Sequence, residues 1–128
     1  EQEMERLDWS NSSLRESEQF FRRGQREFLT KNYHRAIDSF RTALSIYSGH
    51  LLAERYLRMS VYAAEMEAKN HMAIAIQYYE ALQYARAIHH FHEVIALMQH
   101  RPNEAIIKEA QRYIKQAELR LQAAELFP

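Results

Sequence analysis

Apolar residues recur along this chain with the three- and four-residue spacing of amphipathic helices, and short polar segments separate the stretches that carry it. The pattern predicts five helices, over about 14–29, 33–47, 51–82, 85–99 and 104–126. The third is the longest because neither glycine nor proline interrupts it, although its middle is polar. One long helix, bent or solvated near Asn70, is therefore expected, and a true break there is the alternative.

The first residues do not share the helical pattern. Residues 1–13 are polar and end in Ser10, Asn11, Ser12 and Ser13, which indicates a linker, an N-terminal extension or a frayed helix. The expected helical domain covers 14–128. Because the chain begins at Glu1 without a methionine, we expect it to be a module of a larger protein.

Two segments of the chain are near copies of each other. The first contains Tyr33, Ala36, Ile37, Phe40 and Ala43, and the second contains Tyr84, Ala87, Ile88, Phe91 and Val94 at positions 51 residues later. Each is followed by a similar phrase, over 53–58 and 110–115. Duplicated helical units bury their apolar faces by stacking, so the sequence predicts stacked antiparallel hairpins over 14–50 and 68–101, followed by a C-terminal helix.

Composition narrows the class of protein. Hydrophobic residues make up 47% of the chain, as in a folded domain, and only two glycines and two prolines occur, too few for the turns of a β-rich fold. The fold class is therefore all-α. The 17 basic and 17 acidic residues cancel, which argues against a nucleic-acid partner. No cysteine is present, and no apolar run is long enough to span a membrane.

The duplicated segments resemble the tetratricopeptide repeat, a family of stacked helical hairpins. The matching residues are Phe20, Gly24, Tyr33, Ala36, Phe40 and Ala43 in the first copy and Ala75, Tyr78, Tyr84, Ala87 and Phe91 in the second. The sequence departs from the family at Ser48, where a closing proline is usual, and the copies lie 51 residues apart rather than 34. The resemblance implies an α-α superhelix lengthened by a long central helix, similar to repeats of bacterial assembly and signalling proteins.

A glycine inside the first expected helix points to close packing. Gly24 lies among helix-forming residues, where glycine is unfavourable by about 0.5–1 kcal/mol relative to alanine. We therefore expect a neighbouring helix to approach the chain closely at this residue.

The resemblance also implies where a partner would bind. In the family the first helix of each hairpin lines a concave groove, and the corresponding residues here are Phe21, Gln25, Phe28, Met72, Ile76 and Tyr79. This apolar, aromatic lining favours a partner helix or an extended peptide over a terminal carboxylate. The expected function is that of a protein-interaction module or scaffold. The competing arrangement is that the last helix or the segment near Leu14 already fills the groove.

A structural role in homo-oligomers is the alternative function. The last helix carries a coiled-coil-like seam whose bulky residues are Ile107, Ile114 and Leu121. If these residues pack on the fourth helix the seam is internal, whereas exposure in a monomer would favour dimerisation. Three such side chains suffice only for a weak association, so a monomer or a weak homodimer is expected.

Sites for chemistry are sparse in the sequence. His89, His92 and Glu93 could share a helix face and contact a metal ion, but a solvated histidine-rich face is the preferred interpretation, and no metal or cofactor is expected. The chain has no glycine-rich phosphate loop, no H-E-x-x-H motif and no serine–histidine–aspartate arrangement. We therefore do not expect an enzyme.

Overall fold

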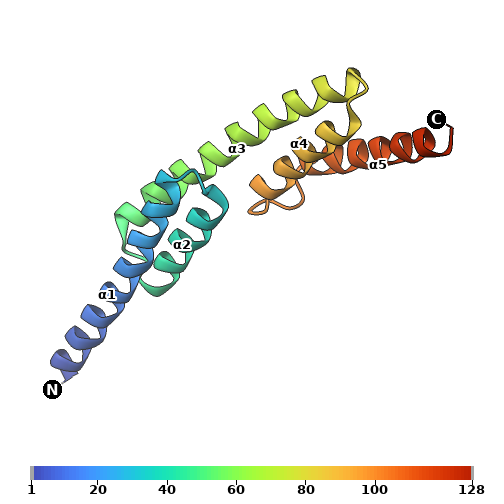
Figure 1. Ribbon diagram of the computed structural model, residues 1–128. Coiled ribbons are helices and arrows are strands. Elements are labelled where there is room, and N and C mark those ends of the chain that lie inside the picture. The colour runs from blue at the N-terminus through green and yellow to red at the C-terminus, as the bar shows by residue number, and fades with distance from the viewer. Residues whose placement is uncertain (1, 128) are drawn as a thin grey trace. The chain divides into compact units, whose positions relative to one another are not determined.

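The computed structural model describes the backbone of residues 2–127 and the side chains of residues 11–127. Its helices are α1 (Gln2–Leu29), α2 (Tyr33–Ile46), α3 (Leu51–Glu80), α4 (Tyr84–Leu97) and α5 (Ala105–Leu126) (Figure 1). The described residues contain no strand, which confirms the all-α fold of packed helices.

Two helix boundaries bear on the sequence-based expectations. Helix α1 begins at Gln2 rather than near Leu14, so the segment for which a linker, an extension or a frayed helix was expected is helical from Gln2 onward. Helix α3 runs without interruption from Leu51 to Glu80, which confirms one long helix in place of a break near Asn70.

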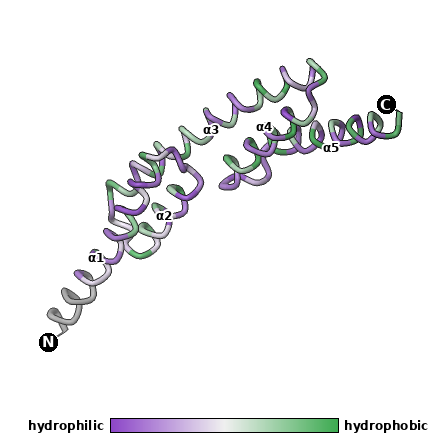
Figure 2. Tube along the Cα trace, viewed as in Figure 1, coloured by the Kyte–Doolittle hydropathy of each residue, from purple (hydrophilic) through white to green (hydrophobic). Residues whose placement is uncertain are grey.

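The chain divides into two compact units at the middle of α3, with unit 1 ending at Ala63 and unit 2 beginning at Ala64. Unit 1 contains α1, α2 and the first half of α3; unit 2 contains the second half of α3, α4 and α5. Each unit is thus a helical hairpin followed by a third helix. Along the coloured part of each helix, hydrophobic and hydrophilic residues are interspersed, as expected for amphipathic helices (Figure 2).

The core of unit 1 forms around an aromatic residue of α2. Phe40 is fully buried and packs with Phe21 of α1 and Ala53 of α3. The α1 backbone comes so close that a Cβ atom at Gly24 would lie 2.6 Å from Phe40 Cε1. Gly24 is therefore the point of close helix approach that the sequence predicts.

A buried histidine anchors the start of α3 to α1. The Nδ1 atom of His50 accepts a hydrogen bond of 3.1 Å from the backbone N–H of Ala53, in the manner of a helix cap. Because Nδ1 accepts, Nε2 carries the proton and donates to the Glu18 carboxylate over 2.8 Å. His50 thereby satisfies one free N–H of the first turn of α3.

The core of unit 2 has a corresponding centre in Phe91 of α4, which is also fully buried. The buried core residues contributed by its three helices are Ala68, Met72, Ala75, Ala87, Phe91, Val94, Met98, Ile107, Ala110 and Ile114. The position that corresponds to Gly24 in unit 2, 51 residues later, is Ala75. This alanine is buried in the same cluster as Phe91, so a Cβ atom is accommodated at this position in unit 2.

Both hairpin turns close in the same way, each on a residue with a left-handed backbone. Lys31 and Leu82 both have φ of 63°. In unit 1 the N–H of Asn32 donates to the Glu27 carbonyl over 2.8 Å; in unit 2 the N–H of Gln83 donates to the Tyr78 carbonyl over 2.9 Å. These are the six-residue closing bonds of a Schellman turn, formed here without glycine.

Two ring contacts that Tyr56 makes in unit 1 recur with Tyr113 in unit 2. In unit 1 the ring of Tyr56 on α3 lies 5.8 Å from Phe28 and 5.7 Å from Phe40. In unit 2 the ring of Tyr113 on α5 lies 5.1 Å from Tyr79 and 4.9 Å from Phe91. The similar phrases at 53–58 and 110–115 thus occupy the same structural position, on the helix that covers each hairpin.

Candidate functional site

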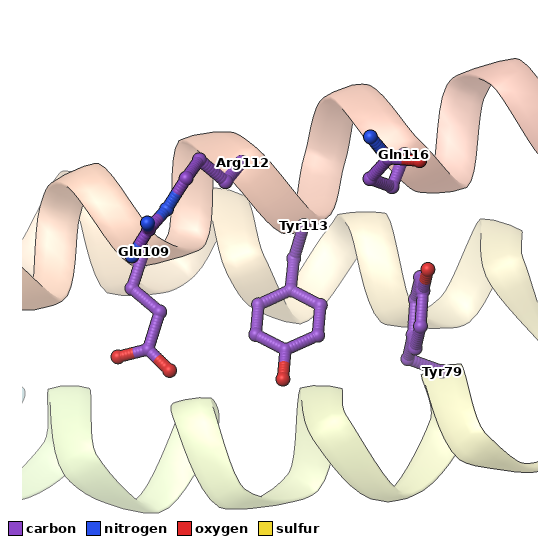
Figure 3. Close-up of a pocket in the computed structure, with 5 residues that line it drawn as sticks. All are labelled: Tyr79, Glu109, Arg112, Tyr113 and Gln116. Carbon is purple, nitrogen blue, oxygen red and sulfur yellow. The ribbon is translucent and has the colours of Figure 1, made fainter.

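An open hollow lies between α3 and α5 in unit 2. Its volume is about 280 Å³, and it is lined by Tyr79 from α3 and by Glu109, Arg112, Tyr113 and Gln116 from α5. Tyr113 and Glu109 point from α5 toward α3, while the ring of Tyr79 rises toward α5 (Figure 3). The hollow therefore has an aromatic floor and a polar rim.

The aromatic floor is held in place by the core. Tyr113 stacks on the buried ring of Phe91 with the ring planes 10° from parallel, and it meets Tyr79 edge to face at 77°. Tyr84, the first residue of α4, holds Tyr79 from its other side, with ring centroids 5.4 Å apart. Two tyrosines fixed by ring packing can receive a ligand with little loss of side-chain entropy.

The polar rim comes from successive turns of one helix face. Glu109, Arg112 and Gln116 follow each other at three- and four-residue spacing on α5. Glu109 is half-buried, whereas Arg112 and Gln116 are exposed. Together these side chains supply an amide, a cationic donor and a carboxylate acceptor around two phenol groups.

None of these five side chains makes a hydrogen bond or ion pair with another residue of the described part of the chain. Their polar groups are therefore available to an incoming ligand. The hollow is smaller than the roughly 300–1,000 Å³ of most small-molecule sites, and its size suits one or two side chains of a larger ligand.

Two of the six residues of the expected groove are buried, one in each unit. Phe21 is 3% exposed and Met72 is 7% exposed, and each belongs to the core of its unit. Their side chains are covered because the third helix of each unit packs over the hairpin. Both are therefore core residues of their units.

The other four expected groove residues are half-buried, and only one lines the hollow. Phe28 packs against Tyr56, and Ile76 packs against the core of unit 2. Gln25 is half-buried on α1, and Tyr79 alone reaches the hollow. Within unit 2 the last helix covers the hairpin, as in the competing arrangement considered for the sequence.

The proposed seam of the last helix lies largely inside unit 2. Ile107 and Ile114 are buried in the same cluster as Phe91 and Val94 of α4, and Leu121 is half-buried. The two isoleucines therefore pack on the fourth helix, the arrangement that corresponds to an internal seam.

The histidines of α4 lie in different surroundings from one another. His89 and His92 are exposed and Glu93 is half-buried, while His90 turns toward α3 and places its Nδ1 atom 2.9 Å from Nδ1 of His71. Partial burial lowers the pKa of His90, and the neighbouring imidazoles of His71 and His89 lower that pKa further. Among the described residues no group of three or more histidine, aspartate or glutamate side chains is placed to hold a metal ion.

Four of the five residues around the hollow come from α5 and were not among the sequence-based candidates. The repeated phrase aligns Arg112 and Tyr113 with Arg55 and Tyr56 and could have drawn attention to them. Periodicity alone does not show that Tyr113 faces Tyr79, because that contact joins residues far apart in the sequence.

Comparison with family models, curated proteins and solved structures finds no match to this chain. In the described part of the chain no helix is both long and apolar enough to cross a bilayer.

Proposed function

We propose that this chain is a protein-interaction module, similar in kind to tetratricopeptide repeats, that binds a peptide segment of a partner protein in the hollow between α3 and α5. The observation that carries the proposal is the pair of ring-packed tyrosines, Tyr79 and Tyr113, beside Arg112, which has no ion pair with another described residue. Tyrosine and arginine, together with tryptophan, are enriched at the sites that dominate binding energy between proteins.

The chemistry of the hollow favours an extended peptide with one apolar side chain. The faces and edges of the two tyrosine rings provide the contact for that side chain. Gln116 and the tyrosine hydroxyls can exchange hydrogen bonds with the peptide backbone, and Arg112 can donate to a carbonyl or carboxylate. Glu109 adds an acceptor for a peptide N–H or a basic side chain.

The repeat architecture supports the same function. Each unit stacks a third helix on a hairpin, and such arrays present extended surfaces on rigid helices. Residues that face the hollow from α5 are held by the buried isoleucines on the opposite side of that helix. The site is thus built on elements whose position the core fixes.

Peptide selection from a displayed random library, followed by fluorescence anisotropy with the enriched peptides, tests the proposal. The double variant Arg112→Ala, Gln116→Ala should lower affinity by about tenfold or more, because each residue supplies a polar contact to the peptide. The matched control is Gln111→Ala, Lys115→Ala, which alters exposed residues on the same helix that do not line this hollow.

The result that contradicts the proposal is equal binding by the site variant and the control at unchanged helicity. Failure of any peptide to enrich against the wild-type chain would also count against it. Tyr79→Phe separates the ring from the hydroxyl: a peptide that bonds the hydroxyl should lose affinity for this variant while the ring packing persists.

A further inference from the structure

Unit 1 contains a counterpart of the hollow's lining with different chemistry. The edge-to-face pair Tyr79 and Tyr113 corresponds to Phe28 and Tyr56, whose planes meet at 83° with centroids 5.8 Å apart. The arginine that precedes the tyrosine is also repeated, as Arg55 and Arg112. The same framework of two aromatic rings and one arginine therefore stands in both units.

The rim residues differ between the two units. The positions of Glu109 and Gln116 in unit 2 are occupied by Leu52 and Met59 in unit 1. Leu52 is 52% exposed, Met59 is 42% exposed, and Tyr62, one turn further along α3, is 67% exposed. A polar rim in one unit is thus a row of large apolar side chains in the other.

We call Leu52, Arg55, Met59 and Tyr62 the outer stripe of α3. The spacing of three, four and three residues places all four on one side of the helix, opposite the buried Ala53 and Ser60. Exposed apolar side chains gathered along one face mark an interaction surface more often than scattered ones do.

Arg55 gives the stripe its charge. It makes no ion pair or hydrogen bond with another described residue, whereas the neighbouring Arg58 is bonded to Glu54 over 3.1 Å. Among the described residues, the stripe therefore carries one positive charge without an ion-pair partner, surrounded by apolar side chains. Burial of an unpaired guanidinium is unfavourable, so a partner that covers Arg55 needs a carboxylate beside it.

We infer that the outer stripe of α3 is a second interaction surface, which binds an amphipathic helix that carries apolar residues along one face and an acidic residue beside them. Anchors spaced by three and four residues over three turns match a partner helix, since a helix repeats its apolar residues with the same period. The unbranched side chain of Met59 can adapt to different partner side chains. A second copy of this chain fits less well, because a parallel pairing of two stripes would set Arg55 against Arg55.

The probe is a designed amphipathic peptide with leucine at seam positions and glutamate beside them, titrated into the whole chain and followed by fluorescence anisotropy. Two comparison peptides carry lysine in place of glutamate, or serine in place of leucine. The glutamate peptide should bind, the lysine peptide should bind about tenfold more weakly, and the serine peptide should not bind.

The double variant Leu52→Glu, Met59→Gln gives the stripe the rim residues of unit 2. It should weaken binding of the glutamate peptide by about tenfold or more while the circular dichroism spectrum stays unchanged, because both side chains are exposed. Arg55→Ala should remove the preference for glutamate over lysine. As the matched control, Leu119→Gln changes an exposed apolar residue of unit 2 and should leave binding unaltered.

Three results would overturn the inference. These are absence of binding by the glutamate peptide, equal binding by the double variant, and self-association of the wild-type chain that the double variant abolishes. The variant Arg112→Ala, Gln116→Ala should not change binding of the glutamate peptide, which distinguishes the outer stripe of α3 from the hollow of unit 2.

Discussion

Phe91 and Tyr113 lie parallel, with their ring planes 10° apart and their centroids 4.9 Å apart, and the pair Phe40 and Tyr56 occupies the equivalent place in unit 1 at 5.7 Å and 45°. In both units a fully buried phenylalanine of the hairpin supports a tyrosine of the covering helix. In unit 2 this tyrosine also meets Tyr79 edge to face and lines the hollow.

Removal of either central phenylalanine should be strongly destabilising. Phe40→Ala and Phe91→Ala should each lower the free energy of unfolding by about 3–5 kcal/mol, because a fully buried ring leaves a cavity. Denaturant titration followed by circular dichroism measures the loss. Leu126→Ala, a change of a side chain that is 73% exposed, serves as the control and should have little effect.

Addition of one methyl group at Gly24 should also destabilise the chain. The new Cβ would lie 2.6 Å from Phe40 Cε1, and this ring is fully buried. Overpacking of this kind costs about 1–3 kcal/mol, which exceeds the roughly 0.5–1 kcal/mol gained by replacing a helical glycine. Thermal melts of Gly24→Ala should therefore show a lower midpoint; an unchanged or higher midpoint would mean that α1 and α2 are further apart.

Replacement of Leu82, in the turn between α3 and α4, by glycine should raise the free energy of unfolding. Leu82 has φ of 63° and is 70% exposed, so it bears left-handed backbone strain while burying little surface. Because that conformation costs an ordinary residue roughly 1–2 kcal/mol, Leu82→Gly should raise the stability by up to about 1 kcal/mol. Leu82→Ala retains the Cβ atom and should bring no such gain in the same denaturant titration.

Acidification should destabilise the chain through His90. Its pKa in the folded chain lies below the usual 6.5, owing to partial burial and to His71 and His89, and is raised only in part by Glu93. The unfolded chain therefore binds a proton more readily, so the stability contributed by neutral His90 is present above pH 6.5 and is lost as the pH falls through the lowered pKa.

Urea titrations of wild type and His90→Gln at about pH 7.5 and about pH 5.5 check this dependence. The wild type should lose more stability between the two values than the variant does. Equal losses would show that His90 does not experience the contacts with His71 and His89.

Truncation of a buried isoleucine in the last helix should destabilise the chain. Ile114→Ala should cost about 2–5 kcal/mol, because the side chain is 7% exposed within the core of unit 2. Leu121→Lys should leave the sedimentation behaviour unchanged if the seam is internal. A shift from dimer to monomer with Leu121→Lys would instead support the oligomerisation role.

Sequence periodicity by itself predicted the five helices and the residues at the centre of each hairpin, although it did not predict the start of α1 at Gln2. The spacing around Phe40 and Phe91 identified both hairpin cores, and the uninterrupted run after Leu51 predicted the long helix α3. Gly24 indicated a close helix contact before its partner was known. These features are local, since residues three or four positions apart share a face of one helix whatever surrounds it.

Only the tertiary structure decided which apolar faces remain open. Phe21 and Met72 have the spacing of groove residues, yet the third helix of each unit covers them. Tyr113 became part of a candidate site because α5 packs beside α3, which joins it to Tyr79 from 34 positions earlier in the sequence. A helical pattern shows that one face of a helix is apolar, but it does not show which segment covers that face. Burial depends on contacts between segments that are distant in the chain.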